Sequence, residues 1–411
     1  MTRIYDPIHG FITITPLMKK FMDTEEVQRL RDLKQLGATT FVFPSANHTR
    51  FEHSIGVSHY AGMMMENLFK NGATITENDT ESIREKYISC ARLAGLLHDI
   101  GHGPYSHLFD DYVKSDTTPE HEERGCIIIQ KIVTRYNIDI SPECIQIIIN
   151  MINPPKDKIY NWIYQVVANK VNHLDVDKLD YIQRDSFYLG MKCSGEYSRI
   201  IKDAKVFDVE NGTQICWPIK LQYEIFQIFA TRYRLHKQVY NNPNVKACEF
   251  VIVEILKKIS LQMDLTLQGD SIIYCKYAND MRMKLFNRQH WKFVGELTFV
   301  DCNNVVNLKK YTDYMEKHNV NYQKLVLGFG GIDNPLKNVK YYQYDALVRT
   351  CGTNFSFMVP SECKEILLRL YAKNLTDLSV VRKHYNNILN IYNSDGRCGG
   401  DTNEQSGEES T

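Results

Sequence analysis

The chain has 411 residues, enough for one large lobe and a smaller second one. Its 49 basic and 49 acidic residues balance, so the overall charge gives no reason to expect binding to nucleic acid or to an anionic membrane. The 11 cysteines form no CxxC pair, and the first ten residues lack the apolar stretch of a signal peptide. We therefore expect a soluble intracellular protein, cytoplasmic, nuclear or both, with free thiols and no membrane span.

Apolar residues recur at helical spacing along the first two thirds of the chain. Residues 25–36 follow Asp23 and Thr24, which can cap a helix. Their apolar side chains fall on one stripe, formed by Val27, Leu30, Leu33 and Leu36. The same spacing predicts helices over 54–69, 90–100, 123–133 and 223–240. These segments predict a mainly α protein.

From about residue 268 the pattern changes to alternating and β-branched stretches. We expect strands over 292–300 and 322–331, and extended chain over 339–348 after an Asn-Pro turn. A last helix is expected over 361–392, after Pro360, and the polar residues 393–411 are expected to form a disordered acidic tail. The chain is thus divided into a helical core (1–265), a smaller α+β lobe (266–392) and the tail (393–411).

Histidines and acids gather in three segments. His53 lies at the head of a predicted helix, His98 and Asp99 are adjacent in "LLHDIGHGPYSH" and are expected on a helix, and Asp177 lies in "NHLDVDKLDYIQRD". Imidazoles combined with carboxylates suit a borderline divalent cation such as Mn, Fe, Zn or Co better than Ca. Each residue alone is explained equally well by a cap or a surface ion pair. The four together, in this order, favour a hydrolytic metal site.

The order His, His-Asp, Asp is the signature of the HD phosphohydrolase superfamily, and longer stretches resemble one family within it. The stretches that carry the resemblance are residues 6–57, 95–110, 174–185, 231–240, 287–296 and 359–374. They resemble the deoxynucleoside triphosphate triphosphohydrolases that carry a SAM domain before the HD domain, the vertebrate antiviral restriction factor type. The resemblance covers roughly residues 3–392 and includes no SAM domain.

The resemblance implies an HD-domain catalytic core over 1–265 and a regulatory and oligomerisation lobe over 266–392. It further implies that water splits a deoxynucleoside triphosphate at the α-phosphorus and releases deoxynucleoside and inorganic triphosphate. A divalent metal, Mn, Fe, Zn or Mg, would be held by His53, His98, Asp99 and Asp177. Such a metal polarises an α-phosphate oxygen and lowers the pKa of a bound water.

The departing deoxynucleoside needs an acid. By resemblance His107, oriented by Asp110, protonates the 5′ oxygen, while His102 and His121 line the phosphate cleft. An imidazole that titrates near neutrality suits this role. His121 is alternatively an ordinary solvent-facing histidine of a loop.

The resemblance also assigns residues to substrate binding: Gln35, Leu36, Arg50, Lys178, Tyr181, Asp185, Arg232 and Tyr240. The basic members would hold phosphates. Gln35 and Asp185 would hydrogen-bond the 3′-hydroxyl, and Tyr240 would block a 2′-hydroxyl. Each also has a plain explanation as a surface or core residue. After Tyr240 the sequence reads "NNPN", where the family commonly has larger polar and basic residues, and this departure leaves the base preference open.

Members of this family assemble into tetramers through two allosteric nucleotide pockets. The matching positions are Asp23, Gln28 and Arg31 for guanine, and Arg199, Lys220, Arg288 and Lys292 for a second deoxynucleotide. Four positions depart from the family pattern: Thr2, Pro218, Glu224 and Tyr344. Loss of cationic side chains weakens the binding of a polyanion in such a pocket, since each charge-assisted hydrogen bond to phosphate contributes roughly 1.5–3 kcal/mol. We therefore expect a homo-oligomer, dimer to tetramer, activated by GTP or dGTP; plain surface charges are the alternative for the second pocket.

Two other functions stay open. One is an HD phosphohydrolase that acts on a nucleoside monophosphate or a cyclic nucleotide, against which the set of Gln35, Asp185 and Tyr240 argues. The other is a catalytically idle nucleotide sensor or a binder of single-stranded nucleic acid. The sequence has no stripe of basic and aromatic residues that would favour nucleic acid.

Overall fold

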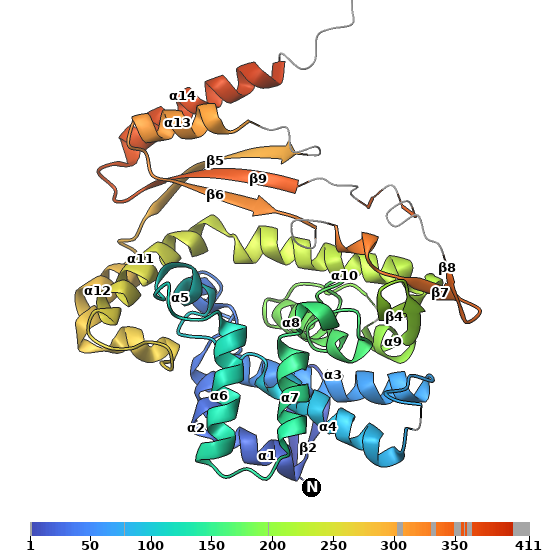
Figure 1. Ribbon diagram of the computed structural model, residues 1–411. Helices are drawn as coiled ribbons and strands as arrows, with labels where there is room; N and C mark the ends of the chain where they lie inside the picture. Colours follow the sequence, from blue (N-terminus) through green and yellow to red (C-terminus); the bar gives the residue numbers. More distant parts are fainter. Residues whose placement is uncertain are drawn as a thin grey trace, which may run out of the picture.

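A computed structural model describes residues 2–77, 79–195, 197–301, 307–329, 334–348, 355–356, 358–359 and 364–397. A large helical body carries a smaller layer in which two helices lie on a three-stranded sheet (Figure 1). The predicted fold class, mainly α with a smaller α+β C-terminal part, is confirmed. Among the described helices, none combines the length and apolarity that crossing a lipid bilayer requires. The seven cysteines of the described part carry free thiols, as expected.

Helix α3 (Arg50–Lys70) runs through the helical body and packs against α4 (Glu81–Leu97) and α8 (Val176–Tyr188). The other helices of this body are α5 (His107–Tyr112), α6 (His121–Arg135), α7 (Pro142–Ile152), α9 (Tyr197–Lys202) and α10 (Gln222–Leu235). The chain continues from α10 into a π-helical turn, His236–Tyr240. These helices confirm the helices predicted over 54–69, 123–133 and most of 223–240. The predicted helix over 90–100 is correct only to Leu97.

The chain begins with a hairpin of β1 (Thr2–Asp6) and β2 (Gly10–Ile14), followed by α1 (Pro16–Met22). The Asp6 carboxylate accepts hydrogen bonds from the amides of Ile8 and His9, which closes the turn. Gly10 has φ +71°, a backbone conformation that glycine adopts without strain. Ile12 and Ile14 of β2 are buried, so the hairpin is anchored in the core by one face.

The helix predicted over 25–36 is wrong beyond its first turn. Helix α2 spans only Glu25–Gln28 and passes into a 3₁₀ turn, Arg29–Asp32, after which Leu33 is extended. The amide of Arg50 donates to the Leu33 carbonyl, and the amide of Gln35 donates to the His48 carbonyl. These tertiary hydrogen bonds outweigh the helical preference that the apolar stripe indicates. Val27, Leu30 and Leu33 of that stripe are nevertheless buried. Thr24 occupies the cap position without a side-chain cap, because its hydroxyl donates to the Phe21 carbonyl.

Three antiparallel strands form the sheet of the upper layer, in the order β5 (Lys292–Asp301), β9 (Lys364–Ala372) and β6 (Tyr322–Leu327). Helices α13 (Lys309–Lys317) and α14 (Leu378–Arg397) cover one face, and α11 (Pro243–Ser260) lies below the other (Figure 1). Phe250 of α11 meets Tyr371 of β9 edge to face at 5.1 Å. Helix α11 therefore joins the sheet to the helical body.

The helix predicted over 361–392 is wrong in its first half, which forms β9. The strand is central in its sheet and covered on both faces, and every residue from Ile366 to Ala372 is buried. A continuous apolar run of this kind lacks the alternation of a half-exposed strand and is hard to distinguish from a buried helix. Helix α14 extends to Arg397, five residues into the expected tail, and the rest of that tail lies outside the described residues.

The segment 339–348 forms strands, as predicted, but joins the helical body. Strands β7 (Tyr341–Gln343) and β8 (Ala346–Val348) extend a sheet with β3 (Lys205–Val209) and β4 (Gly212–Pro218), in the order β3-β4-β7-β8. The 3₁₀ turn Asp270–Tyr274 and helix α12 (Asn279–Phe286) pack with α11. The division at residues 265 and 266 stays a prediction, although contacts cross it.

Candidate metal centre and active site

His53 sits in the first turn of α3, at a position fixed by a capping box. The Glu52 side chain accepts from the Thr49 amide, and the Thr49 side chain accepts from the backbone of the third helical residue. Helix α8 begins with a comparable cap, in which the Asp175 carboxylate accepts from the Lys178 amide. Asp177 therefore projects from the first turn of α8. The two capped helix starts bring His53 and Asp177 together, with 3.0 Å between His53 Nε2 and Asp177 Oδ1.

His98 and Asp99 follow the end of α4 and do not lie on a helix, so that expectation is wrong. Helix α4 ends at Leu97, and the Ile100 amide bonds to the Leu97 carbonyl in a turn. His98 Nε2 lies 3.6 Å from Asp177 Oδ1 and 3.4 Å from Asp99 Oδ1. Asp99 Oδ2 lies 3.8 Å from His53 Nε2. Three of the four predicted metal ligands, His53, His98 and Asp177, thus bring donor atoms within 4.8 Å of one another, while Asp99 lies beside them and pairs with Arg50.

The donor atoms of this quartet fit a divalent metal. His53 Nδ1 bonds to Asp180 Oδ2 at 2.7 Å, and His98 Nδ1 bonds to the Gly95 carbonyl at 2.8 Å. With a metal bound, each imidazole would keep its proton on Nδ1 and offer the lone pair of Nε2 to the metal. His98 Nε2 is buried and has no hydrogen-bond partner among the described residues. Two imidazole nitrogens and carboxylate oxygens around one point suit Mn, Fe or Zn.

Negative charge at the quartet requires a positive partner. Burial would lower the pKa of His53, but hydrogen bonds to Asp177 and Asp180 raise it to about 10. Burial alone would raise the pKa of Asp99, but Arg50 and His98 hold that pKa well below its usual range. Arg50 Nη1 donates to Asp99 Oδ2 at 2.5 Å, and Arg50 Nε donates to Ser106 Oγ at 2.7 Å. A divalent cation would meet the charge requirement that His53 meets as an imidazolium.

Three histidines form a second cluster beside the quartet. The rings of His102 and His121 stack with centroids 4.0 Å apart, and His107 meets both edge to face. Gly101 makes this approach possible, because a Cβ there would lie 1.9 Å from the His121 carbonyl oxygen. Burial and then neighbouring cations lower the pKa of His102 to about 4 and that of His107 to about 3. Both imidazoles are therefore neutral near pH 7 in the protein alone.

Asp110 faces His102 and His121, whereas the sequence assigned it to His107. Asp110 Oδ2 lies 3.4 Å from His121 Nδ1 and 3.6 Å from His102 Nδ1, and its Oδ1 accepts from Arg124 Nη2 at 2.6 Å. Among the described residues, His107 has no hydrogen bond to this carboxylate. Helix α5 starts at His107 and turns Asp110 toward α6, which explains the difference.

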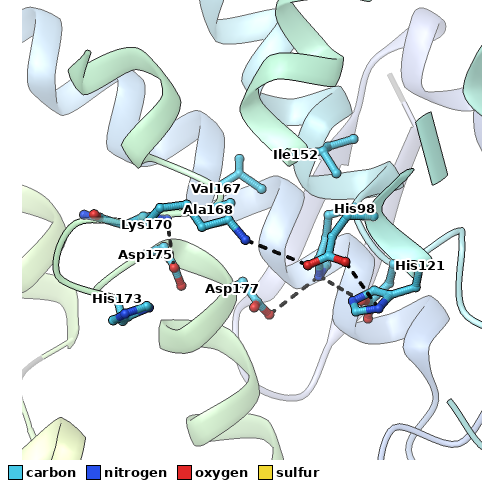
Figure 2. A pocket seen from close by; sticks show the side chains of 12 residues that line it. His98, His121, Ile152, Val167, Ala168, Lys170, His173, Asp175 and Asp177 are labelled. Atoms are coloured by element: carbon cyan, nitrogen blue, oxygen red, sulfur yellow. Dashed lines mark hydrogen bonds and ion pairs between the residues drawn. The ribbon is translucent and has the colours of Figure 1, made fainter. Parts of the chain in front are cut away.

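A cavity of about 160 Å³ opens beside the quartet. Figure 2 shows His98 and His121 on one side of it, Asp177 at the centre, and Lys170, His173 and Asp175 on the other side. Lys170 Nζ lies 3.8 Å from Glu122 Oε1, which also lines the cavity. The sequence analysis missed Lys170 and His173. The only signal in the sequence is their place, seven and four residues before Asp177.

The predicted substrate residues of α8 share one face of that helix. Lys178, Tyr181 and Asp185 follow one another at intervals of three and four. Asp185 Oδ1 bonds to His48 Nε2 at 2.6 Å, and Asp185 Oδ2 accepts from the Tyr240 hydroxyl. Burial, then Arg232 and Lys178, lower the pKa of His236, so both cations lie near that ring.

Gln35 and Leu36 lie at the same end of the site. The Gln35 amide bonds to the His48 carbonyl, and His48 holds Asp185, which connects Gln35 to the predicted sugar pocket. Gln35 Oε1 is buried without a hydrogen-bond partner in the described part of the chain. Leu36 is half-buried and precedes the 3₁₀ turn Gly37–Phe41.

The predicted guanine-reading residues form a corner between α1 and the 3₁₀ turn. Gln28 Nε2 donates to the Met22 carbonyl at 2.7 Å and Gln28 Oε1 accepts from Arg31 Nε at 2.8 Å. The Arg31 guanidinium lies 3.6 Å from the centroid of the Phe51 ring, and Asp23 is exposed. Contacts within the chain therefore hold the side chains of Gln28 and Arg31 in this corner.

The residues predicted for the second pocket fall into two separate groups. Arg199 lies on α9, and Lys220, 3.5 Å from Asp203, lies beyond the end of β4. Arg288 and Lys292 follow α12, where Lys292 Nζ donates to the Arg288 carbonyl. Figure 1 shows α9 and α12 at opposite ends of the molecule. One chain therefore does not bring the four cations together.

The turn that carries His102 is also tied to residues beyond 265. Arg29 donates to the carbonyls of Ile100, His102 and Gln268 at 2.7–3.1 Å. The buried Asp270 carboxylate accepts from the amides of Lys34 and Tyr105. Neither residue was singled out from the sequence, because nothing in its local pattern marks Arg29 or Asp270.

Comparison with known proteins decides the family. The HD domain family matches residues 50–209, which include the whole metal quartet. A protein of Dictyostelium discoideum named as a deoxynucleoside triphosphate triphosphohydrolase SAMHD1 homolog is 31% identical over 95% of this chain and 81% of its own length. The chain belongs to the SAMHD1 family. The SAMHD1 of Bos taurus is 29% identical over 94% of this chain and 77% of its own length.

The SAMHD1 family also has a viral relative. An HD domain-containing protein of Acanthamoeba polyphaga mimivirus is 30% identical over 93% of this chain and 94% of its own length. The resemblance inferred from the motifs is therefore confirmed at the level of the family. The roles of individual residues in this SAMHD1-family chain stay predictions.

Replacing Asp177 with alanine should remove bound metal while the helical fold remains. The Asp177 carboxylate is the common neighbour of His53 and His98, so its loss should weaken metal binding by at least ~100-fold. Metal content after dialysis, measured by atomic spectrometry beside circular dichroism, tests this. Glu122→Gln removes a carboxylate that pairs with His121 and Lys170 and not with His53 or His98, so it is the matched control and should keep its metal. Full metal retention by Asp177→Ala would contradict the assignment.

Proposed function

We propose that this chain hydrolyses deoxynucleoside triphosphates to deoxynucleoside and inorganic triphosphate, with a divalent metal held by His53, His98, Asp99 and Asp177. The observation that carries the proposal is the convergence of two imidazole Nε2 atoms on Asp177, directly beside the three-histidine cluster. Membership of the SAMHD1 family supports this substrate class, because the named relatives are deoxynucleoside triphosphate triphosphohydrolases.

When bound, the metal would stabilise charge on the attacked α-phosphate and make nearby water more acidic. Arg50 orients this end of the site, because it holds Asp99 with Nη1 and Ser106 with Nε. Its Nη2 group remains for a phosphate oxygen, as expected of a guanidinium that binds phosphate. Lys178 at the start of α8 and Arg232 on α10 add positive charge near His236, which supports the phosphate-binding role proposed for them.

The cavity beside the quartet suits the triphosphate part of the substrate. Lys170 and His173 stand opposite His98 and His121, so a chain of phosphates in this cavity would reach the Lys170 ammonium and the His173 imidazole. His173 has φ +57°, a conformation that costs a residue other than glycine of order 1 kcal/mol, and this cost is common at functional sites. We therefore add Lys170 and His173 to the phosphate-binding residues.

The 5′ oxygen of the deoxynucleoside needs a proton as it leaves. His107 is the donor predicted from the sequence, and His121 is the alternative that the Asp110 contact favours. An imidazole oriented by a carboxylate is the usual arrangement for general acid catalysis. A bound triphosphate adds negative charge next to both rings and would raise the pKa of His107 from about 3.

A substrate with a sulfur in place of the 5′ bridging oxygen distinguishes the two donors. A thiolate leaves without protonation, so the variant that lacks the acid should lose about 10²–10⁴-fold with the natural substrate and regain most of this with the sulfur analogue. We expect the rescue in His121→Ala or in His107→Ala, measured as triphosphate release. Arg232→Ala, which removes a phosphate contact, is the control and should show no rescue. Rescue of neither histidine variant would remove both from the acid role.

The Tyr240 ring should make the sugar pocket select deoxyribose, because it leaves no space for a 2′-hydroxyl. Wild-type protein incubated with manganese and each nucleoside triphosphate should release triphosphate from the four deoxynucleotides and not from ribonucleotides. Tyr240→Ala should admit ribonucleotides because the ring that fills the 2′ position is gone. Tyr240→Phe loses only the hydroxyl that donates to Asp185 and should keep the discrimination. Unchanged discrimination in Tyr240→Ala would place the ring outside the sugar pocket.

We further propose that guanine nucleotide promotes assembly of this chain into dimers and tetramers. The ordered corner of Asp23, Gln28 and Arg31 supports a guanine site, since an exposed carboxylate is a natural acceptor for the guanine N–H edge. The two separated cation groups support a second pocket only if two subunits share it. Tyr344 and Glu224 replace cations or donors there, so we infer weak dependence on a second nucleotide.

Mass photometry with GTP alone, dATP alone and both nucleotides tests this regulation. We expect assembly with GTP that dATP increases little, because a ligand shifts an equilibrium only by its preference for the assembled state. Asp23→Ala should abolish the effect of GTP, whereas Asp313→Ala, an exposed acid of α13, should not. A strict requirement for both nucleotides, or assembly without any nucleotide, would contradict the proposal.

A further inference from the structure

We propose that the β1–β2 hairpin is a support of the metal centre, in which His9 is a positioning residue that fixes His53 through Asp180. The inference rests on the metal site of the proposed function and is independent of the substrate. His9 lies in the turn of the hairpin, far from His53 in sequence, and none of the predicted roles involves it. Its side chain is only 2% exposed, which is unusual for a histidine in a hairpin turn.

The Asp180 carboxylate is the junction of this arrangement. Oδ2 accepts from His53 Nδ1 at 2.7 Å and from Arg184 Nε at 2.8 Å. Oδ1 bonds to His9 Nε2 at 2.6 Å and accepts from Arg184 Nη2 at 2.9 Å. An ionised carboxylate offers about four lone-pair positions, so all of them are used. Asp180 therefore has no freedom to rotate, and the imidazole bonded to it is fixed in plane and in tautomer.

Arg184 connects the same carboxylate to the hairpin a second time. Its Nη1 donates to Asp6 Oδ2 at 2.8 Å, while Asp6 Oδ1 closes the hairpin turn through the amides of Ile8 and His9. Arg184 and Asp180 are fully buried, and Asp6 is 3% exposed. A buried charged network is stable only when every member is paired. The turn, Asp180 and His53 therefore hold their positions jointly.

Gly56, one turn after His53 on α3, leaves the space for this junction. A Cβ at this position would lie 2.0 Å from Asp180 Oδ1 and 2.4 Å from Arg184 Nη2. Because hydrogen bonds hold both side chains in place, a methyl group would displace the carboxylate from His53. The absence of a side chain at Gly56 is thus part of the same support.

Removing the imidazole of His9 should weaken metal binding without removing a ligand. One lone pair of Asp180 would lose its partner in a dry environment, and the carboxylate would reorient. Loss of such an outer partner weakens metal binding by about 10–100-fold. His9→Gln keeps an N–H group near the place of Nε2 and should retain most of the affinity, which a purely steric role would not predict.

The experiment compares His9→Ala, His9→Gln and the matched control His59→Ala. The His59 ring is tilted relative to that of His9, with centroids 5.3 Å apart, and has no bond to Asp180 in the described structure. The readouts are the Co(II) dissociation constant by competition with a chelator, the visible Co(II) absorption spectrum, and the unfolding temperature of metal-free protein. We expect weaker Co(II) binding and an altered Co(II) spectrum in His9→Ala alone. The unfolding temperatures of metal-free His9→Ala and His59→Ala should agree.

Equal Co(II) affinity and spectra in wild type and His9→Ala would overturn the inference. An equal loss in His59→Ala would also overturn it, because the effect would then reflect packing of the ring cluster. If His9→Ala does not fold, Gly56→Ala tests the same support from α3 and should also weaken Co(II) binding and change its spectrum; unchanged binding would refute the proposal. Failure of wild-type protein to bind Co(II) would instead refute the metal site of the proposed function.

Discussion

Buried negative charge is the constraint on which the rest of this structure depends. Asp99 and Asp180 are buried and the half-buried Asp177 lies beside them, and ionised carboxylates in such a place require positive partners. Arg184 neutralises Asp180 and Arg50 neutralises Asp99. Asp177 has no arginine or lysine partner among the described residues and faces only two imidazoles. The charge of Asp177, which a protonated His53 balances in the protein alone, is therefore located where the HD-domain motif predicts a metal cation.

The charged and imidazole side chains of the site lie at the ends of helices. His53 and Asp177 lie in first turns, His98 and Asp99 follow the last residue of α4, and His107 and His121 begin α5 and α6. Positions at helix ends combine a fixed backbone with an open approach, which helix interiors do not offer. The hydrophobic interior of α3 and α4 then works as a frame that keeps several ends at one place.

Sequence reasoning predicted the ligand types and missed what orients them. His53, His98, Asp99 and Asp177 stand in a recognisable order, so the metal site could be predicted. Asp180 and His9 could not be, because their role depends on contacts across 171 residues that no local pattern encodes. The partner of Asp110 was misassigned for a related reason: its contacts with His121 and Arg124 of α6 depend on the tertiary approach of two helices, and not on the spacing of residues 102–110. Strand β9 was misread because burial on both faces removes the alternation that marks a strand.

The hydrogen bonds made by Arg29 and Asp270 limit where the chain can be divided. Arg29 holds the carbonyls of Ile100 and His102 in common with that of Gln268, and Asp270 receives the amides of Lys34 and Tyr105. A shortened chain that ends at residue 265 would keep every metal ligand, yet two amides beside the active site would lose a buried acceptor. The smallest autonomous catalytic unit therefore includes at least the 3₁₀ turn Asp270–Tyr274. An insertion or deletion between residues 266 and 270 would displace the turn that carries His102 before it disturbed the upper layer.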